Sequence, residues 1–132
     1  MPADAACRAV SIYDVAETIF AAWRLGAGDV PIPVSLRPLE YAVAECRHLL
    51  PDAQQGYLSF SGGRCVETPE IILAAETVMA IQTNGTDFLT ARFAGGEPNA
   101  RRMVAEAGMT TASAVALGQA LKAAVDRRRN QA

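Results

Sequence analysis

Near the N-terminus of the chain, apolar residues recur every three or four positions, and this spacing predicts an amphipathic helix. The apolar residues that share one helical face there are Ile12, Val15, Ile19 and Trp23. Ser11 has a short hydroxyl side chain that suits a helix N-cap, and Asp14 stands where it completes a capping box. We expect the helix to start after Ser11 and to end at Gly26, because glycine is common at helix ends.

A second apolar stripe follows an extended connector, Ala27–Pro33, in which prolines disfavour helix. The members of the stripe are spaced by four, three and four residues: Leu39, Val43, Cys46 and Leu50. We expect this helix to start at Ser35 or Arg37 and to end at Pro51, which lacks the backbone donor of a helical residue. His48, the single histidine of the chain, lies in its last predicted turn.

Two more helices are predicted in the last third of the chain. One runs from Glu97 to Gly108, and the other starts at Thr110 or Thr111 and continues to about Arg128. The last helix has small residues at every second position: Ala112, Ala114, Ala116, Gly118 and Ala120. Because small side chains make a helix thin, we expect a neighbouring helix to pack closely against it.

The stretch Thr68–Gly85 is expected to be the element around which the rest of the chain packs. Thr68 suits an N-cap and Asn84-Gly85 suits a helix end, so one interpretation is a single helix. The alternative depends on the many β-branched residues, which favour strands, and on Asn-Gly, which is a strong hairpin signal. In that alternative Thr77–Thr83 and Thr86–Phe93 pair as antiparallel strands. The pattern leaves both interpretations open.

Gln54–Glu67 has the composition of a β-hairpin with its turn at Ser61-Gly62-Gly63. The predicted fold class is therefore α+β and mostly helical, with about five helices around a short β-hairpin or small antiparallel sheet. At 132 residues the chain has the length of a single globular domain, 1–132. We expect residues 1–9 to be a loose lead-in and residues 129–132 to fray.

Composition indicates an ordinary globular protein of the cytoplasm. The chain is 51% hydrophobic and 20% charged, which argues against wholesale disorder. Its three cysteines, Cys7, Cys46 and Cys65, are too few and scattered for a disulfide framework and favour reduced thiols. It has no apolar run of about 20 residues, and its first residues lack a basic segment followed by an apolar one, so we expect neither a signal peptide nor membrane association. Eleven arginines against one lysine, with abundant alanine, indicate a GC-rich bacterial or phage genome.

Charge is unevenly distributed along the chain. Residues 1–96 have six arginines and eleven acidic residues, a formal charge of −5, whereas residues 97–132 have six basic and three acidic residues, or +3. Such a division is typical either of a face that binds nucleic acid or an acidic partner, or of an unevenly charged solvated surface. The candidate partner-binding residues are the arginines of the two C-terminal helices: Arg101, Arg102, Arg127 and Arg128.

The sequence offers few constellations for chemistry, and we expect no enzyme, metal site or cofactor. Cys46 and His48 are two residues apart and point in different directions on a helix, which disfavours zinc binding. One hypothesis makes His48 a general base that Glu45 orients, and another brings it to Cys65 in space; the alternative is an exposed histidine. The chain lacks the glycine-rich and nucleophile-elbow motifs of nucleotide-binding proteins and hydrolases.

Residues 103–121 resemble a helix-turn-helix in their spacing, with Arg101 and Arg102 placed to meet phosphates. The second helix argues against DNA reading, because only Ser113 and Gln119 in its first turns can reach a base edge. An antiparallel helical hairpin explains the same pattern.

The resulting hypothesis is a small cytosolic bacterial or phage protein that binds another macromolecule through protein–protein contacts. It would act as an adaptor, inhibitor or regulator, with a second copy of itself as the first expected partner in a homodimer. One alternative is a nucleic-acid-binding regulator that uses the basic C-terminal helices. A second alternative is an enzyme with a cleft around His48 or Cys65.

Overall fold

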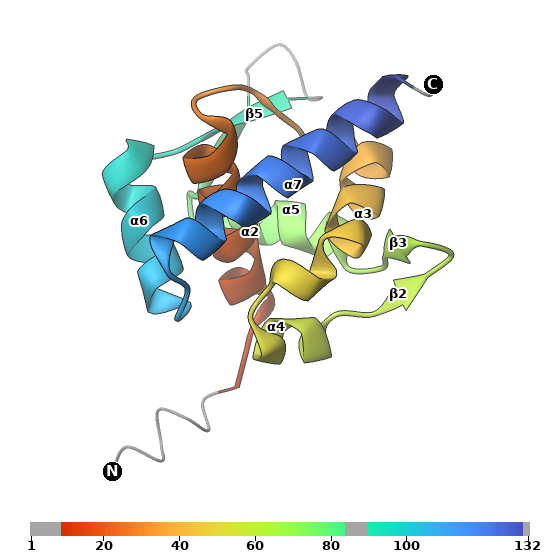
Figure 1. Ribbon diagram of the computed structural model, residues 1–132, viewed down its shortest axis with the longest axis horizontal. Helices are drawn as coiled ribbons and strands as arrows, with labels where there is room; N and C mark the ends of the chain where they lie inside the picture. The colour runs from red at the N-terminus through yellow and green to blue at the C-terminus, as the bar shows by residue number, and fades with distance from the viewer. Residues whose placement is uncertain (1–8, 84–89, 131–132) are drawn as a thin grey trace.

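The computed structural model describes residues 9–83 and 90–130, which form a mainly helical α+β fold (Figure 1). The helices of this part of the chain are α2 (Ile12–Ala27), α3 (Leu36–Glu45), the 3-10 helix η1 (Arg47–Leu49), α4 (Asp52–Tyr57), α5 (Thr68–Thr77), α6 (Gly96–Glu106) and α7 (Thr111–Asn130). The strands are β1 (Ile32–Pro33), β2 (Phe60–Ser61), β3 (Arg64–Cys65), β4 (Ile81–Thr83) and β5 (Thr90–Phe93). The predicted fold class is confirmed.

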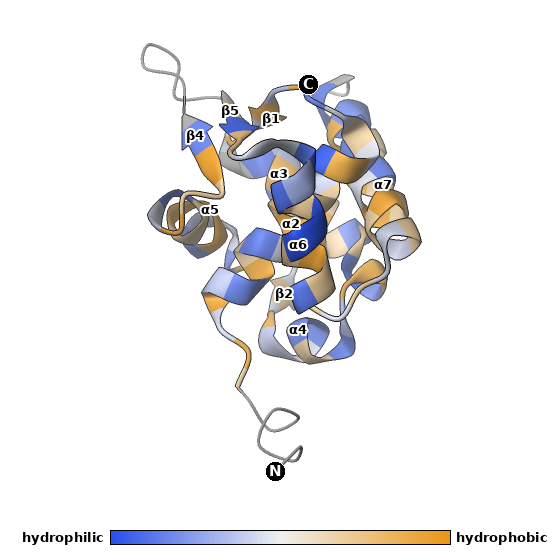
Figure 2. Cartoon of the chain, turned by 90° about the vertical axis from the view of Figure 1, so that its left-hand side faces the viewer, coloured by the Kyte–Doolittle hydropathy of each residue, from blue (hydrophilic) through white to orange (hydrophobic). Residues whose placement is uncertain are grey.

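Helix α2 lies at the centre of the fold. Its residues Thr18–Trp23 are all buried, and α5, α6 and α7 all pack against it. Figure 2 shows α2 between α7 on one side of the molecule and α5 on the other. The expectation that Thr68–Gly85 forms the centre is therefore wrong. The physical reason is that α2 has apolar residues at every position from Ile19 to Trp23, whereas α5 exposes Glu70 and Leu73.

The start of α2 matches the sequence prediction. Ser11 is the N-cap, its backbone N–H donates to Asp14 Oδ2 at 2.9 Å, and the Asp14 N–H donates to Ser11 Oγ at 3.3 Å. The end does not match: the helix continues through Gly26 to Ala27, and Gly28 (φ 84°) follows it.

Gly26 lies inside α2 because α7 crosses the helix there. A Cβ atom on Gly118 would lie 3.0 Å from the Gly26 Cα and would clash with the Ala22 carbonyl oxygen. A Cβ on Gly26 would clash with the backbone of α7 at Val115. The two backbones are thus in direct contact, and the expected close packing against the thin α7 is confirmed.

The stretch Thr68–Gly85 is divided between helix and strand, so the single-helix interpretation is wrong. Helix α5 ends at Thr77, and β4 then pairs antiparallel with β5 with Ile81 opposite Phe93. The antiparallel pairing that the alternative interpretation predicted is thus confirmed, although the paired strands are shorter than predicted. The predicted turn Asn84-Gly85 and the residues Thr86–Leu89 lie outside the described residues. The β-branched Ile81 and Thr83 favour strand over a continued helix.

Thr68 does not cap α5 as expected. Glu67 occupies the N-cap, and Thr68 is the first helical residue, fully buried. Its hydroxyl donates to the Cys65 carbonyl oxygen at 2.9 Å instead of accepting from the first turn. The side chain therefore links α5 to the preceding strand β3.

Strand β1, within the predicted extended connector, adds a third strand to the sheet. It pairs antiparallel with β5, so the strand order is β1-β5-β4. Pro33 is tolerated because β1 is an edge strand, where one backbone side needs no donor. Two residues are too few to produce a strand pattern in the sequence.

The stripe predicted for the second helix is buried as expected: Leu39, Val43, Cys46 and Leu50. The predicted hairpin Gln54–Glu67 is shorter than expected, because Gln54–Tyr57 belong to helix α4, with Pro51 at its N-cap. Only β2 and β3 pair, with Phe60 opposite Cys65. Gly62 (φ 62°) and Gly63 (φ 76°) form the turn in left-handed conformations, as the glycine pair indicates.

The two C-terminal helices follow the prediction closely. Helix α6 ends at Glu106, and Gly108 follows with a φ of 82°. Thr110 precedes α7, and its Oγ1 accepts the Ser113 N–H at 3.0 Å, which is a typical cap interaction. Helix α7 continues to Asn130, so Arg129 and Asn130 are helical where we expected fraying.

Candidate functional site

Four arginines from three separate elements lie around the outward side of α3, and we call them the arginine cluster: Arg47, Arg64, Arg127 and Arg128. Arg47 begins η1, Arg64 begins β3, and Arg127 and Arg128 stand near the C-terminal end of α7. Two α3 carboxylates, those of Glu40 and Glu45, and the Tyr41 ring lie among them. The cluster is thus assembled by the fold from distant parts of the chain.

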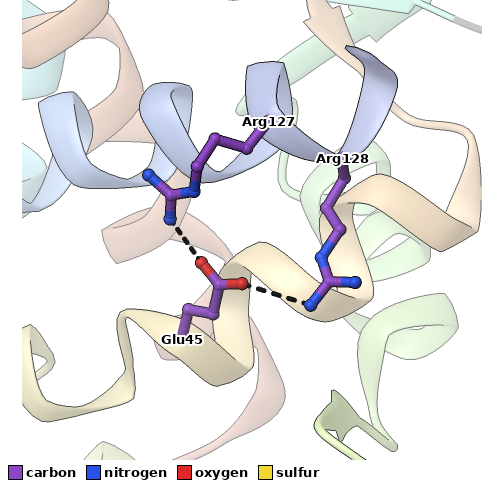
Figure 3. A network of polar contacts seen from close by, with 3 residues as sticks. All are labelled: Glu45, Arg127 and Arg128. Atoms are coloured by element: carbon purple, nitrogen blue, oxygen red, sulfur yellow. Dashed lines mark hydrogen bonds and ion pairs between the residues drawn. The ribbon is translucent and has the colours of Figure 1, made fainter. Parts of the chain in front are cut away.

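Arg127 and Arg128 both contact the carboxylate of Glu45 (Figure 3). The distance from Arg127 Nη2 to Glu45 Oε2 is 2.6 Å, and that from Arg128 Nη2 to Glu45 Oε1 is 3.3 Å. Two guanidinium groups therefore share one carboxylate, which leaves the group of three with an excess positive charge. Each guanidinium has five N–H donors, so further acceptors can bind beside Glu45.

Aromatic rings hold two of the arginines in place. The guanidinium carbon of Arg128 lies 3.9 Å from the centroid of the Tyr41 ring, and that of Arg47 lies 4.9 Å from the centroid of Phe60. Such cation–π contacts fix the plane of a guanidinium and restrict its rotamers. Half of the cluster is therefore preorganised before any partner arrives.

The turn of the β2–β3 hairpin also lies next to Tyr41. A Cβ atom on Gly63 would lie 3.9 Å from the Tyr41 ring, so the hairpin turn is next to it. Arg64 Nη1 lies 3.7 Å from Glu40 Oε2, and its side chain is 52% exposed. The hairpin thus places a further guanidinium next to a carboxylate of α3.

Arg101 and Arg102 do not join the cluster. They lie on α6, which Figure 1 shows on the opposite side of the molecule from the C-terminal end of α7. Arg101 pairs with Glu97 at 3.6 Å, and Arg102 contacts Glu106 at 2.7 Å and the Asn99 side chain at 2.6 Å. The four residues selected from the sequence thus form two separate pairs.

The uneven charge of the sequence is partly compensated in space. Glu40 and Glu45 belong to the acidic first part of the chain, and Glu45 pairs with arginines of the basic last part. Sequence reasoning missed Arg47 and Arg64, because they follow no charged run in the sequence. A signal was available in their positions, next to a predicted helix end and to a predicted turn.

The catalytic hypotheses concerned His48, Glu45 and Cys65, and the structure gives the surroundings of each of them. His48 is exposed in η1, and Glu45, which was expected to orient it, binds Arg127 and Arg128. Burial, followed by the Glu45 charge, raises the pKa of the Cys46 thiol from 9.0 to about 11. Burial also raises the pKa of Cys65, whose sulfur lies 3.9 Å from Glu67 Oε1. At neutral pH both are protonated and unreactive.

Within residues 9–83 and 90–130, no group of three or more histidine, cysteine or acidic side chains is placed to hold a metal ion. In the same ranges, no helix combines the length and the apolar character needed to cross a bilayer. The chain matches no protein-family model, no curated protein and no solved structure.

Proposed function

We propose that this chain is a small cytosolic protein of a bacterium or phage that binds another protein, as an adaptor, inhibitor or regulator. The arginine cluster is the proposed contact surface, and an acidic segment of the partner is its proposed ligand. The observation that supports this most directly is the pair of guanidiniums on the single Glu45 carboxylate. A carboxylate of the partner would complete the charge balance through charge-assisted hydrogen bonds.

The composition of the surface supports a protein partner. Arginine and tyrosine are enriched in protein interfaces and at their energetic centres. Two apolar side chains close to the hairpin in the chain are also exposed, Tyr57 by 41% and Val66 by 55%. An interface there would combine apolar burial with charge pairing.

A second copy of the chain is the first proposed partner. The outer side of α5 exposes Glu70 and Glu76 together with Leu73, so each molecule offers an acidic and partly apolar helix face. Such a face is complementary in charge to the arginine cluster of another copy. The cytosolic assignment has support in Cys46 and Cys65, which are free thiols.

The test compares two pairs of arginines in size-exclusion chromatography with light scattering and in pull-downs from the native host. The double variant Arg127→Gln/Arg128→Gln should lose self-association or partner capture. The matched control Arg101→Gln/Arg102→Gln changes the charge equally on α6 and should keep both. A strict monomer at all concentrations together with no captured protein would contradict the proposal, as would equal binding by both variants.

Nucleic-acid binding is the second candidate, and it has one supporting observation: two of the four guanidiniums of the cluster lie over aromatic rings. The carboxylates of Glu40 and Glu45 within the cluster and the net charge of −2 oppose an extended polyanion. A gel shift that weakens steeply with salt and is lost in Arg127→Gln/Arg128→Gln would favour this candidate. No shift at low salt would eliminate it.

A further inference from the structure

A groove of about 320 Å³ opens between the first turns of α2, the start of α4 and the C-terminal half of α6. It lies apart from the arginine cluster, near the end of α2 that points toward α4 in Figure 1. Its volume is at the lower end of the range for small-ligand sites, about 300 to 1,000 Å³. Neither His48 nor Cys65 lines it.

A buried amide lies in the wall of the groove. Gln54 is only 4% exposed, and its Nε2 donates to Thr18 Oγ1 at 2.9 Å. The Thr18 hydroxyl in turn donates to the Asp14 carbonyl oxygen at 2.9 Å, so it can only accept from Gln54. This fixes the orientation of the amide, with its nitrogen toward Thr18.

The other end of the same amide, Gln54 Oε1, is buried and accepts no hydrogen bond from the part of the chain that the structure describes. A buried acceptor without a donor costs about 1 to 3 kcal/mol. Because Gln54 lines the groove, a ligand bound there can supply the missing N–H to Oε1. The ligand is thus expected to be a hydrogen-bond donor.

The remaining lining gives the charge and shape of that donor. Three carboxylates line the groove, those of Asp14, Glu17 and Glu106, and each already interacts with another group of the chain. A carboxylate has about four acceptor sites, so each can still bind a cation and makes the groove electronegative. Apolar groups form the rest of the lining, among them Val10 and Met103.

We infer that the groove between α2, α4 and α6 binds an organic cation, an ammonium or guanidinium group on a short aliphatic chain. Its N–H donors would pair with Gln54 Oε1 and the carboxylates, and its methylenes would lie against Met103 and the other apolar lining. A metal ion fits less well, because no three potential ligands converge among the described residues. The cation can be a free small amine or a lysine or arginine side chain of another protein.

The test is an NMR titration of the full chain at low salt with n-butylguanidinium and n-butylammonium, and with neutral n-butyl alcohol as the matched control. We expect saturable shifts of groove amides with the two cations and none with the alcohol. A peptide with a single arginine distinguishes a protein side chain from a free small amine. Tighter binding of the peptide than of n-butylguanidinium indicates a side chain of another protein, and tighter binding of the free cation indicates a small molecule. Equal shifts with the alcohol, or no saturable shift at millimolar cation, would overturn the inference.

Two variants locate the site. Gln54→Met keeps the length of the side chain without its carbonyl and should weaken binding about tenfold or more, as expected for a lost hydrogen bond to a charged donor. Glu106→Gln changes an exposed residue and should weaken binding about two- to threefold. Glu97→Gln removes the matching acid at the other end of α6, outside the groove, and should change nothing. Unchanged affinity for the cation in both Glu106→Gln and Gln54→Met would overturn the inference. Neither variant should lose self-association, because both residues lie outside the arginine cluster. The groove and the proposed function are therefore tested separately.

Discussion

Met79 follows the end of α5 in a left-handed backbone conformation, with φ at 58°, which L-residues rarely adopt. The Ala80 N–H donates to the Ala75 carbonyl at 2.8 Å, and the Met79 N–H donates to the Glu76 carbonyl at 3.1 Å. These two bonds form a Schellman motif. Helix α6 ends with the same pair of bonds, but there glycine, Gly108, takes the left-handed position. Met79 is therefore a strained residue in a motif that favours glycine.

We predict that Met79→Gly stabilises the chain by about 1 kcal/mol. Glycine removes the penalty of about 1 to 2 kcal/mol for a left-handed backbone, and the greater backbone entropy of glycine in the unfolded chain offsets part of this gain. Little packing is lost, since the Met79 side chain is 66% exposed. Urea denaturation measures the change in the free energy of unfolding. Met79→Ala is the control, because it shortens the side chain without relieving the strain. A glycine variant no more stable than the alanine variant would contradict the explanation.

The buried Cys46 thiol makes stability depend on pH in the alkaline range. Its pKa is raised from 9.0 to about 11, so the folded chain holds the proton more tightly than the unfolded chain. The protonated thiol contributes to the free energy of unfolding in full below pH 9. This contribution is lost as the pH rises from 9 toward 11, by about 2 to 3 kcal/mol in all. We expect the free energy of unfolding to fall less steeply over this range in Cys46→Ala than in the unchanged chain. Parallel pH profiles of the two proteins would contradict this assignment.

At the scale of elements, the contact between α2 and α7 depends on two glycines. A Cβ on Gly118 would overlap the Ala22 backbone, and backbone cannot move aside as a flexible side chain can. We predict that Gly118→Ala destabilises the chain by about 2 kcal/mol or more, since overpacking outweighs the better helix propensity of alanine. Thermal unfolding measures the effect.

Gly56 provides the matched control for this crossing. It is also a helical glycine, in α4, but a Cβ there would meet nothing within 4 Å. Gly56→Ala should therefore stabilise the chain by about 0.5 to 1 kcal/mol through helix propensity alone. Destabilisation of equal size by both substitutions would show that glycine is required for a reason other than the close helix contact.

Elements with local signals were predictable from the sequence, and those decided by distant contacts were not. The capping box of Ser11 and Asp14 needs only two residues that are three positions apart, and it formed as predicted. The division after Thr77 depends on the pairing of β4 with β5, which no residue of the stretch specifies alone. Local propensities there favoured helix and strand almost equally, so tertiary pairing decided the outcome.

At the scale of the whole molecule, the candidate site was predictable only in part. The sequence indicated Arg127 and Arg128 through their charge, but their partner Glu45 is 82 and 83 residues away from them along the chain. Arg47 and Arg64 join them because α3 and the hairpin pack together, a contact without a sequence signature. The charge pattern thus indicated two of the four arginines of the cluster, and the fold brought Arg47 and Arg64 to them.

The central position of α2 leads to a prediction about cooperative unfolding. Amides buried among packed helices exchange only when the whole core opens, whereas short, exposed elements open locally at lower free energy. We therefore expect the amides of Thr18–Trp23 to be the slowest to exchange with deuterium, and those of α4 and the β2–β3 hairpin to be among the fastest. Exchange followed by NMR measures each opening free energy. Slower exchange in α5 than in α2 would mean that Thr68–Thr77, as the sequence pattern first indicated, is the most stable part of the core.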